Sequence, residues 1–104
     1  MKRKIRTASP TAPPASRSVR FQITAPQASK VFIAGSFNDW RTNDLSMIRL
    51  PDGKWAKELT ISPGRYEYLF VVDDTWIPDP SDVETVPNPF SGLNSVIVVP
   101  NPGA

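Results

Sequence analysis

The chain has 104 residues, 39% of them hydrophobic, with a formal net charge of +2 and an isoelectric point of about 9.2. This length suits one domain with a single modest core. Cysteine and histidine are both absent, which excludes disulfides, thiolate metal sites and the side chain that most often serves as general base or metal ligand.

The basic residues are concentrated in the first 18 positions. Five of the twelve lysines and arginines lie there without any acidic residue, so residues 19–104 carry seven basic and ten acidic residues. Residues 1–18 are rich in Pro, Ala, Ser and Thr and have too few apolar side chains to form a core, so we expect a disordered basic tail. The folded part is expected to be mildly acidic, and a nucleic-acid role, which we do not expect, would depend on the tail alone.

No stretch resembles a secretory signal or reaches the roughly 20 apolar residues of a membrane span, so we expect no membrane partner. The arginine-rich, acid-poor start leaves an organelle transit segment as an alternative. The missing signals and missing cysteine favour a cytoplasmic location.

After residue 18, short alternating runs are separated by turn residues at intervals of roughly eight to twelve positions, which predicts an all-β sandwich or barrel. A first strand is expected over residues 19–25 and a further run over 45–50. A tight turn at 51–53 then leads into a strand over 54–61, which ends at the Ser-Pro-Gly turn of 62–64.

Residues 31–40, VFIAGSFNDW, combine an apolar strand with a turn that carries a tryptophan. Residues 31–34 have strand composition, Gly35 permits a bend, and Asn-Asp at 38–39 favours a local turn. We expect this arrangement to direct Trp40 outward. The alternative is that Trp40 folds back as a lid on the core.

The clearest strand spans residues 65–72. A hairpin turn at 73–74 leads to a short strand at 75–77, and residues 95–99 form a buried final strand. Residues 78–93 are predicted to be an irregular loop, and loops of that length are usually functional. Alternation along 65–72 places one set of side chains in the core, Tyr66, Tyr68, Phe70 and Val72, and the other set on the opposite face, Glu67, Leu69 and Val71.

We find no catalytic constellation in the sequence. Ser62 and Ser91 have no histidine to activate them, and no glycine-rich phosphate loop is present. The loop aspartates suit turn chemistry, and a glycosidase pair or a calcium site among them is a weaker alternative. The loop aspartates are Asp39, Asp44, Asp73, Asp74, Asp79 and Asp82. From these observations together we expect no enzyme activity, cofactor or metal.

The three tryptophans require separate explanations. Trp55 lies within a predicted strand and is interpreted as a packing residue. Trp40 and Trp76 are both next to loops rich in Asn, Asp and Thr. A flat indole beside polar groups suits a sugar, because the C–H face of the ring stacks on the indole while its hydroxyls need hydrogen-bond partners.

Three stretches in series, residues 31–40, 64–80 and 92–99, resemble the family 48 carbohydrate-binding modules. This family includes the glycogen-binding domain of the AMP-activated kinase beta subunit and the N-terminal modules of isoamylases and glycogen branching enzymes. The resemblance implies an immunoglobulin-like, early-set β-sandwich over residues 19–100. It also implies non-catalytic binding of α-1,4-linked glucans such as glycogen, starch and malto-oligosaccharides.

The resemblance assigns site residues one by one. Trp40 and Trp76 correspond to the stacking platforms of glycogen-binding members. Asn94 corresponds to a sugar-contacting asparagine, and Phe90 to a leucine that enters the curve of the glucan helix.

Two positions depart from the kinase-subunit pattern. Leu69 stands where a lysine binds sugar hydroxyls, and Gly92 stands where a threonine does. Each loss removes a polar contact of about 1 kcal/mol, and we take Leu69 with Phe90 as the apolar margin of the site. The rival hypothesis is a protein-interaction or regulatory module of a glycogen-metabolism complex that has lost most of its sugar affinity, with a glycogen-metabolising enzyme as partner.

Overall fold

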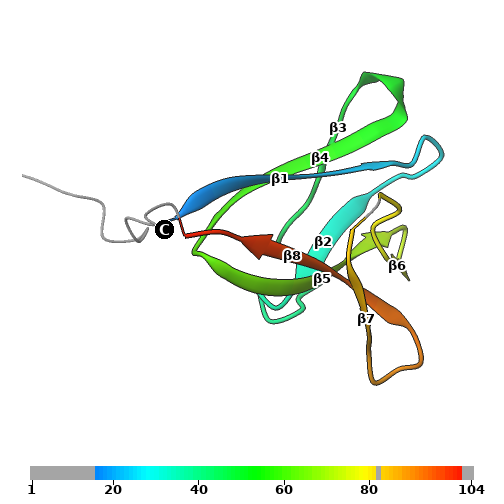
Figure 1. Cartoon of the computed structure of the whole chain (residues 1–104). Coiled ribbons are helices and arrows are strands. Elements are labelled where there is room, and N and C mark those ends of the chain that lie inside the picture. Colours follow the sequence, from blue (N-terminus) through cyan, green and yellow to red (C-terminus); the bar gives the residue numbers. More distant parts are fainter. Residues whose placement is uncertain (1–15, 82, 102–104) are drawn as a thin grey trace, which may run out of the picture.

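Two antiparallel β-sheets face each other in the computed structural model, which describes residues 16–81 and 83–101 (Figure 1). These residues contain no α-helix, which confirms the expected all-β sandwich. The smaller sheet has the order β1-β4-β3, formed by Arg17–Thr24, Lys54–Ile61 and Ile48–Arg49. The larger sheet has the order β2-β5-β8-β7, with β6 paired to β5, formed by Val31–Gly35, Gly64–Val72, Leu93–Val99, Thr85–Pro87 and Thr75–Ile77.

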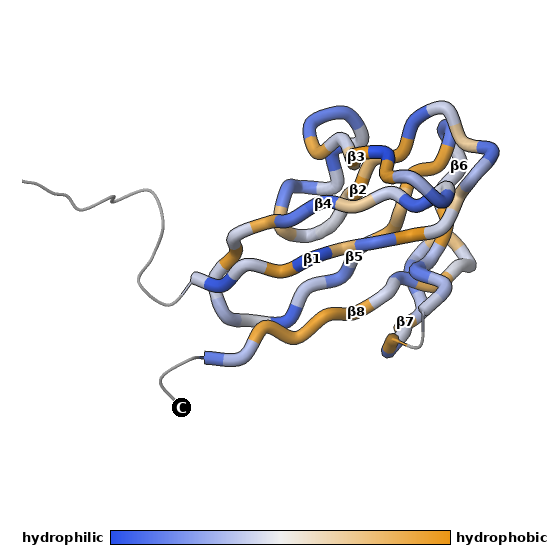
Figure 2. Tube along the Cα trace, turned by 90° about the horizontal axis from the view of Figure 1, so that it is seen from above, coloured by the Kyte–Doolittle hydropathy of each residue, from blue (hydrophilic) through white to orange (hydrophobic). Residues whose placement is uncertain are grey.

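Alternation along the strands decides which side chains meet between the sheets. β1 contributes Phe21 and Ile23, and β5 contributes Tyr68 and Phe70, each at most 3% exposed. The ring of Phe21 lies edge-on to that of Tyr68, with centroids 5.0 Å apart. Burial of each such side chain contributes about 1.5–3 kcal/mol, so this interface is the main source of cohesion. Figure 2 shows β8 as hydrophobic along most of its length, as expected for a strand that helps to close the core.

β5 is buried on both faces at its centre. Tyr68 and Phe70 point into the core as the sequence predicted, yet Leu69 and Val71 on the opposite face are only 8% and 5% exposed. Trp76 on β6 is the direct partner of Val71 in the strand register, so the two side chains share this outer face. The outer face of the larger sheet is therefore apolar here.

Residues 45–50 do not form the single strand that was expected. The backbone N–H of Ile33 donates to the carbonyl of Leu45 at 3.0 Å, and that of Met47 donates to the carbonyl of Val31 at 2.8 Å. Only Ile48–Arg49 pairs with β4 of the other sheet. The segment thus crosses from the larger sheet to the smaller one, and this change of partner divides the expected strand.

Two further boundaries differ from expectation. β1 begins at Arg17, so Arg17 and Ser18, which were assigned to the tail, belong to the sandwich. Residues 1–15 of the expected tail lie outside the described residues. The loop predicted over 78–93 contains β7, because the chain turns back and pairs residues 85–87 with β8.

Among the described residues, no helix has the length and apolarity that a membrane crossing requires.

Candidate functional site

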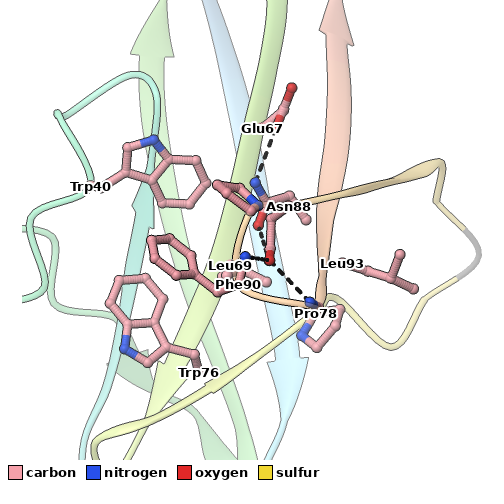
Figure 3. Close-up of a pocket in the computed structure, with 11 residues that line it drawn as sticks. Trp40, Glu67, Leu69, Trp76, Pro78, Asn88, Phe90 and Leu93 are labelled. Carbon is pink, nitrogen blue, oxygen red and sulfur yellow. Dashed lines mark hydrogen bonds between the residues drawn. The ribbon is translucent and has the colours of Figure 1, made fainter.

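An open groove of about 780 Å³ lies on the outer face of the larger sheet (Figure 3). It is formed by β5, β6 and β8 and by the turns that follow β2, β6 and β7. The structure brings together in this groove all five site residues named from the sequence, Trp40, Leu69, Trp76, Phe90 and Asn94. The other lining residues are Glu67, Pro78, Asn88, Pro89, Gly92 and Leu93.

Trp40 is placed by a tightly bonded turn after β2. The Asn38 side chain accepts the N–H of Gly35 at 3.0 Å and donates to Asp44 at 2.7 Å, while the N–H of Trp40 donates to the carbonyl of Gly35 at 2.9 Å. Asp39 and Trp40 have φ angles of 57° and 60°, a left-handed conformation that costs non-glycine residues on the order of 1 kcal/mol each. These hydrogen bonds hold a strained turn that directs the indole of Trp40 into the groove, apart from the core cluster.

The two indoles form an angled pair. Trp76 is 45% exposed, Trp40 is half-buried, and their ring centroids lie 6.5 Å apart with 43° between the planes. Neither indole is stacked flat on the other, so part of each aromatic surface remains open to a ligand. An angle of this size suits a curved partner better than a flat one.

Phe90 is displayed by the turn after β7. Its side chain is 88% exposed. The Asn88 side-chain oxygen accepts the N–H groups of Phe90 at 2.9 Å and Gly92 at 3.0 Å, and the backbone of Asn88 donates to the carbonyl of Gly92. In the view of Figure 3 the ring of Phe90 gathers with the two indoles at one side of the groove.

Asn94 is more enclosed than a direct sugar contact would require. It is 7% exposed, its Nδ2 donates to Glu67 Oε1 at 3.0 Å, and its Oδ1 accepts from Asn88 Nδ2 at 3.1 Å. Glu67 also accepts from Arg65 at 3.4 Å. A chain of polar groups therefore runs along the groove from Glu67 through Asn94 to the Asn88 turn.

Leu69 and Gly92, the two departures from the family pattern, have structural consequences. Leu69 offers the groove a small apolar surface in place of a cation. A Cβ added at Gly92 would lie 3.3 Å from Nδ2 of Asn88. The absence of a side chain at Gly92 therefore leaves space for the amide of Asn88.

Trp55 is confirmed as a packing residue. It is 6% exposed within the core cluster, and its Nε1 donates to the carbonyl of Ala25 at 3.0 Å. The guanidinium of Arg49 lies over its ring at 4.9 Å from the centroid, a cation–π contact that covers the remaining face.

The loop carboxylates described by the structure serve as turn and tether groups. Asp73 accepts the backbone N–H groups of Ser29 and Lys30, each at 3.0 Å. Asp79 accepts the hydroxyl of Tyr68 at 2.5 Å. Burial, followed by the hydrogen bond to Asp79, raises the pKa of Tyr68 well above its usual range. Within the described part of the chain, no three acidic side chains are grouped to hold a metal ion, and Asp82 lies outside that part.

Two polar groove residues, Glu67 and Asn88, were not identified from the sequence. Asn88 stands before Pro89 and four positions before Gly92, a pattern typical of an asparagine that bonds the backbone of its own turn. Glu67 was correctly placed on the outer face of its strand. Nothing in the alternation alone connects that face with the turn that carries Phe90.

Comparison with known proteins gives a consistent picture. Residues 18–103 match the family described as the glycogen recognition site of AMP-activated protein kinase. Over 71 residues the chain is 38% identical to chloroplastic PTST homolog 2 from Arabidopsis thaliana, covering 64% of this chain and 13% of that protein. Over 70 residues it is 34% identical to the beta-2 subunit of mouse 5'-AMP-activated protein kinase, covering 67% and 25%.

A solved structure supports the fold. The crystal structure of maltogenic amylase from S. marinus superposes with a TM-score of 0.65 and 22% identity, covering 82% of this chain and 14% of that one. This chain thus spans a quarter or less of the length of each of these three proteins.

Proposed function

This chain belongs to the family 48 carbohydrate-binding modules, the family of the AMP-activated kinase glycogen recognition site, and on this premise we propose that its groove binds α-1,4-linked glucan without catalysing a reaction. Glycogen, starch and malto-oligosaccharides are the ligands of this class. The observation that carries the proposal is the angled pair of partly open indoles, Trp40 and Trp76, with Phe90 exposed beside them.

The chemistry of glucose explains why this arrangement is suitable. Each pyranose ring has a C–H face that packs against an aromatic plane and a rim of hydroxyls that needs hydrogen-bond partners. The α-1,4 linkage curves the chain, and two platforms set at 43° can contact successive rings of a curved chain. A flat, extended β-linked glucan fits such a pair less well.

We expect weak binding. Two stacked indoles contributing about 1–3 kcal/mol each, with about 1 kcal/mol from polar contacts, correspond to a dissociation constant between millimolar and tens of micromolar for a short malto-oligosaccharide.

A second candidate function is supported by the polar side of the groove. Leu69 provides no cation, and the amide of Asn94 is already bonded to Glu67 and Asn88. A module that has lost its sugar affinity would keep the fold and contact a glycogen-metabolising enzyme without depending on the indole of Trp40. The variant Trp40→Ala separates the two functions. If the chain still co-purifies with such an enzyme after this change, the result favours protein docking.

Tryptophan fluorescence during glucan titration tests the proposal. Maltoheptaose or β-cyclodextrin should give a saturable change in the wild type, and cellohexaose should give none. Trp40→Ala and Trp76→Ala should abolish saturation. Trp55→Phe is the matched control, since Trp55 is buried in the core, and it should retain binding.

No change up to about 10 mM α-glucan, beyond the weak end of the expected range, would reject glucan binding. Equal saturation by cellohexaose would reject the α-glucan specificity. Thermal unfolding of each variant establishes that a loss of binding is not a loss of fold.

A further inference from the structure

We propose that Glu67 is the hydrogen-bond acceptor for sugar hydroxyls in this groove, and that its charge makes the groove select uncharged glucans over glucans that carry phosphate or carboxylate groups. This inference rests on the proposed function and identifies the chemistry of its ligand more narrowly.

The two asparagines have little acceptor capacity left for sugar hydroxyls. Asn94 is 7% exposed and uses both ends of its amide within the protein. The side-chain oxygen of Asn88 accepts two backbone N–H groups, which fills its two lone pairs, and its Nδ2 donates to Asn94. These amides therefore organise the wall of the groove, and the sugar hydroxyls need another acceptor.

Glu67 has the capacity that the amides lack. Its side chain is 35% exposed, Oε1 accepts from Asn94 at 3.0 Å and Oε2 accepts from Arg65 at 3.4 Å. A carboxylate offers about four lone-pair sites, so about two remain for hydroxyl donors. Hydrogen bonds to an ionised acceptor are roughly twice as strong as neutral ones. Figure 3 shows Glu67 at one end of the groove, with Asn88 between it and Phe90.

The charges near the groove are unfavourable for an anion. Among the residues lining the groove, Glu67 is the only charged one. The neighbouring cation, Arg65, is shared between Glu67 at 3.4 Å and Glu84 at 3.6 Å, which leaves one carboxylate in excess. Leu69 supplies no compensating charge. A phosphate or carboxylate on the ligand would therefore meet net negative potential.

The test compares neutral β-cyclodextrin with a 6-O-phosphorylated β-cyclodextrin, measured by calorimetry on wild type, Glu67→Gln and Glu84→Gln. Glu67→Gln keeps a side-chain oxygen that can accept from Asn94 but removes the charge. Its affinity for neutral β-cyclodextrin should therefore fall about 3- to 10-fold. The wild type should prefer the neutral ligand by about fivefold or more, and Glu67→Gln should reduce this preference. Glu84→Gln removes the other partner of Arg65 without touching the groove, and its neutral affinity should stay within about twofold of wild type.

The outcomes separate this inference from the proposed function. If the affinity for neutral β-cyclodextrin depends on Trp40 but is unchanged in Glu67→Gln, the inference alone is overturned. No binding of neutral cyclodextrin by the wild type would overturn both. If Glu67→Gln does not fold, the preference of the wild type for the neutral ligand is measured between about 0.02 and 0.5 M salt. A preference that does not fall with salt would overturn the electrostatic selection.

Discussion

At the scale of single residues, the hydrogen bond between Tyr68 and Asp79 connects the core to the groove. Tyr68 is 2% exposed, and its hydroxyl donates to the carboxylate of Asp79, which stands next to the groove residue Pro78. The backbone N–H of Asp79 donates in turn to Ser95 at 2.7 Å. This partly buried set of bonds attaches the segment after β6 to the larger sheet.

We predict that Tyr68→Phe lowers the free energy of unfolding at pH 7 by about 2 kcal/mol, because it removes a buried hydrogen bond to a charged group. Urea unfolding measures this loss. Tyr66→Phe, which removes a hydrogen bond to the carbonyl of Ser62, is the matched control and should cost about 1 kcal/mol or less.

The same bond predicts a dependence on alkaline pH. The folded state raises the pKa of Tyr68 above its ordinary value of 10.0, mainly through burial. Above pH 10 the unfolded chain releases this proton while the folded protein keeps it, so stability from Tyr68 is complete below pH 10 and declines above it. The difference in unfolding free energy between wild type and Tyr68→Phe should therefore shrink between pH 9 and 11. A constant difference would contradict the prediction.

At the scale of elements, two turns carry the aromatic side chains to the groove. The turn after β2 is anchored by Gly35, whose carbonyl accepts the N–H groups of Asn38 and Trp40. The turn after β7 is anchored by Asn88. Both turns are held by hydrogen bonds within a few residues, so the groove depends on local geometry as well as on the sheet.

Gly35→Ala should destabilise the protein and disturb Trp40. A Cβ at Gly35 would lie 2.5 Å from the carbonyl oxygen of Glu67 and 2.8 Å from the ring of Phe37. Because one contact is backbone of the neighbouring strand, we expect a loss of about 1–3 kcal/mol. Chemical unfolding measures the loss. Gly92→Ala is the control with a milder contact, 3.3 Å to a side-chain amide, and equal losses in the two variants would contradict the explanation.

Asn88→Ala should weaken glucan binding about 3- to 10-fold and lower stability by about 1–2 kcal/mol. The change leaves the N–H groups of Phe90 and Gly92 and the Oδ1 of Asn94 without their partner. Calorimetric titration with maltoheptaose measures the affinity.

Phe90→Ala isolates the aromatic contribution of this turn. Since Phe90 is 88% exposed, its removal should reduce affinity with little effect on stability. Wild-type affinity in both Asn88→Ala and Phe90→Ala would show that the turn takes no part in binding.

At the scale of the whole molecule, the sandwich presents an open groove on the outer face of its larger sheet. We expect a site of this kind, built from aromatic surface with few polar contacts, to bind each segment of a long glucan independently and weakly. High affinity for a polymer then requires several modules on one chain.

We predict that two copies of the chain joined by a flexible linker bind glycogen about 10²- to 10⁴-fold more tightly than one copy. Maltotriose, which is too short to reach two grooves, should bind each copy with unchanged affinity. Co-sedimentation with glycogen and titration with maltotriose measure the two quantities. In a control tandem, Trp40→Ala in one copy should return the glycogen affinity to that of a single module.

The sequence by itself determined most of the strands and singled out the aromatic residues of the candidate site. Side chains alternate along a strand whichever strand becomes its partner, so 54–61 and 75–77 were predicted with the bounds that the structure shows. Trp40 and Trp76 stood out because their neighbours are turn-forming residues. The family resemblance then related them to Phe90 and Asn94, far apart in the chain.

Only the tertiary structure decided how these residues are used. Residues 45–50 divide because their hydrogen-bond partners lie in two different sheets, and β7 forms because β8 is available beside it. Asn94 on β8 is held between Asn88 of the turn after β7 and Glu67 of β5, and these hydrogen bonds bring Glu67 and Asn88 into the same groove. Such pairings join residues up to tens of positions apart, and local pattern carries no information about which distant donor meets which acceptor.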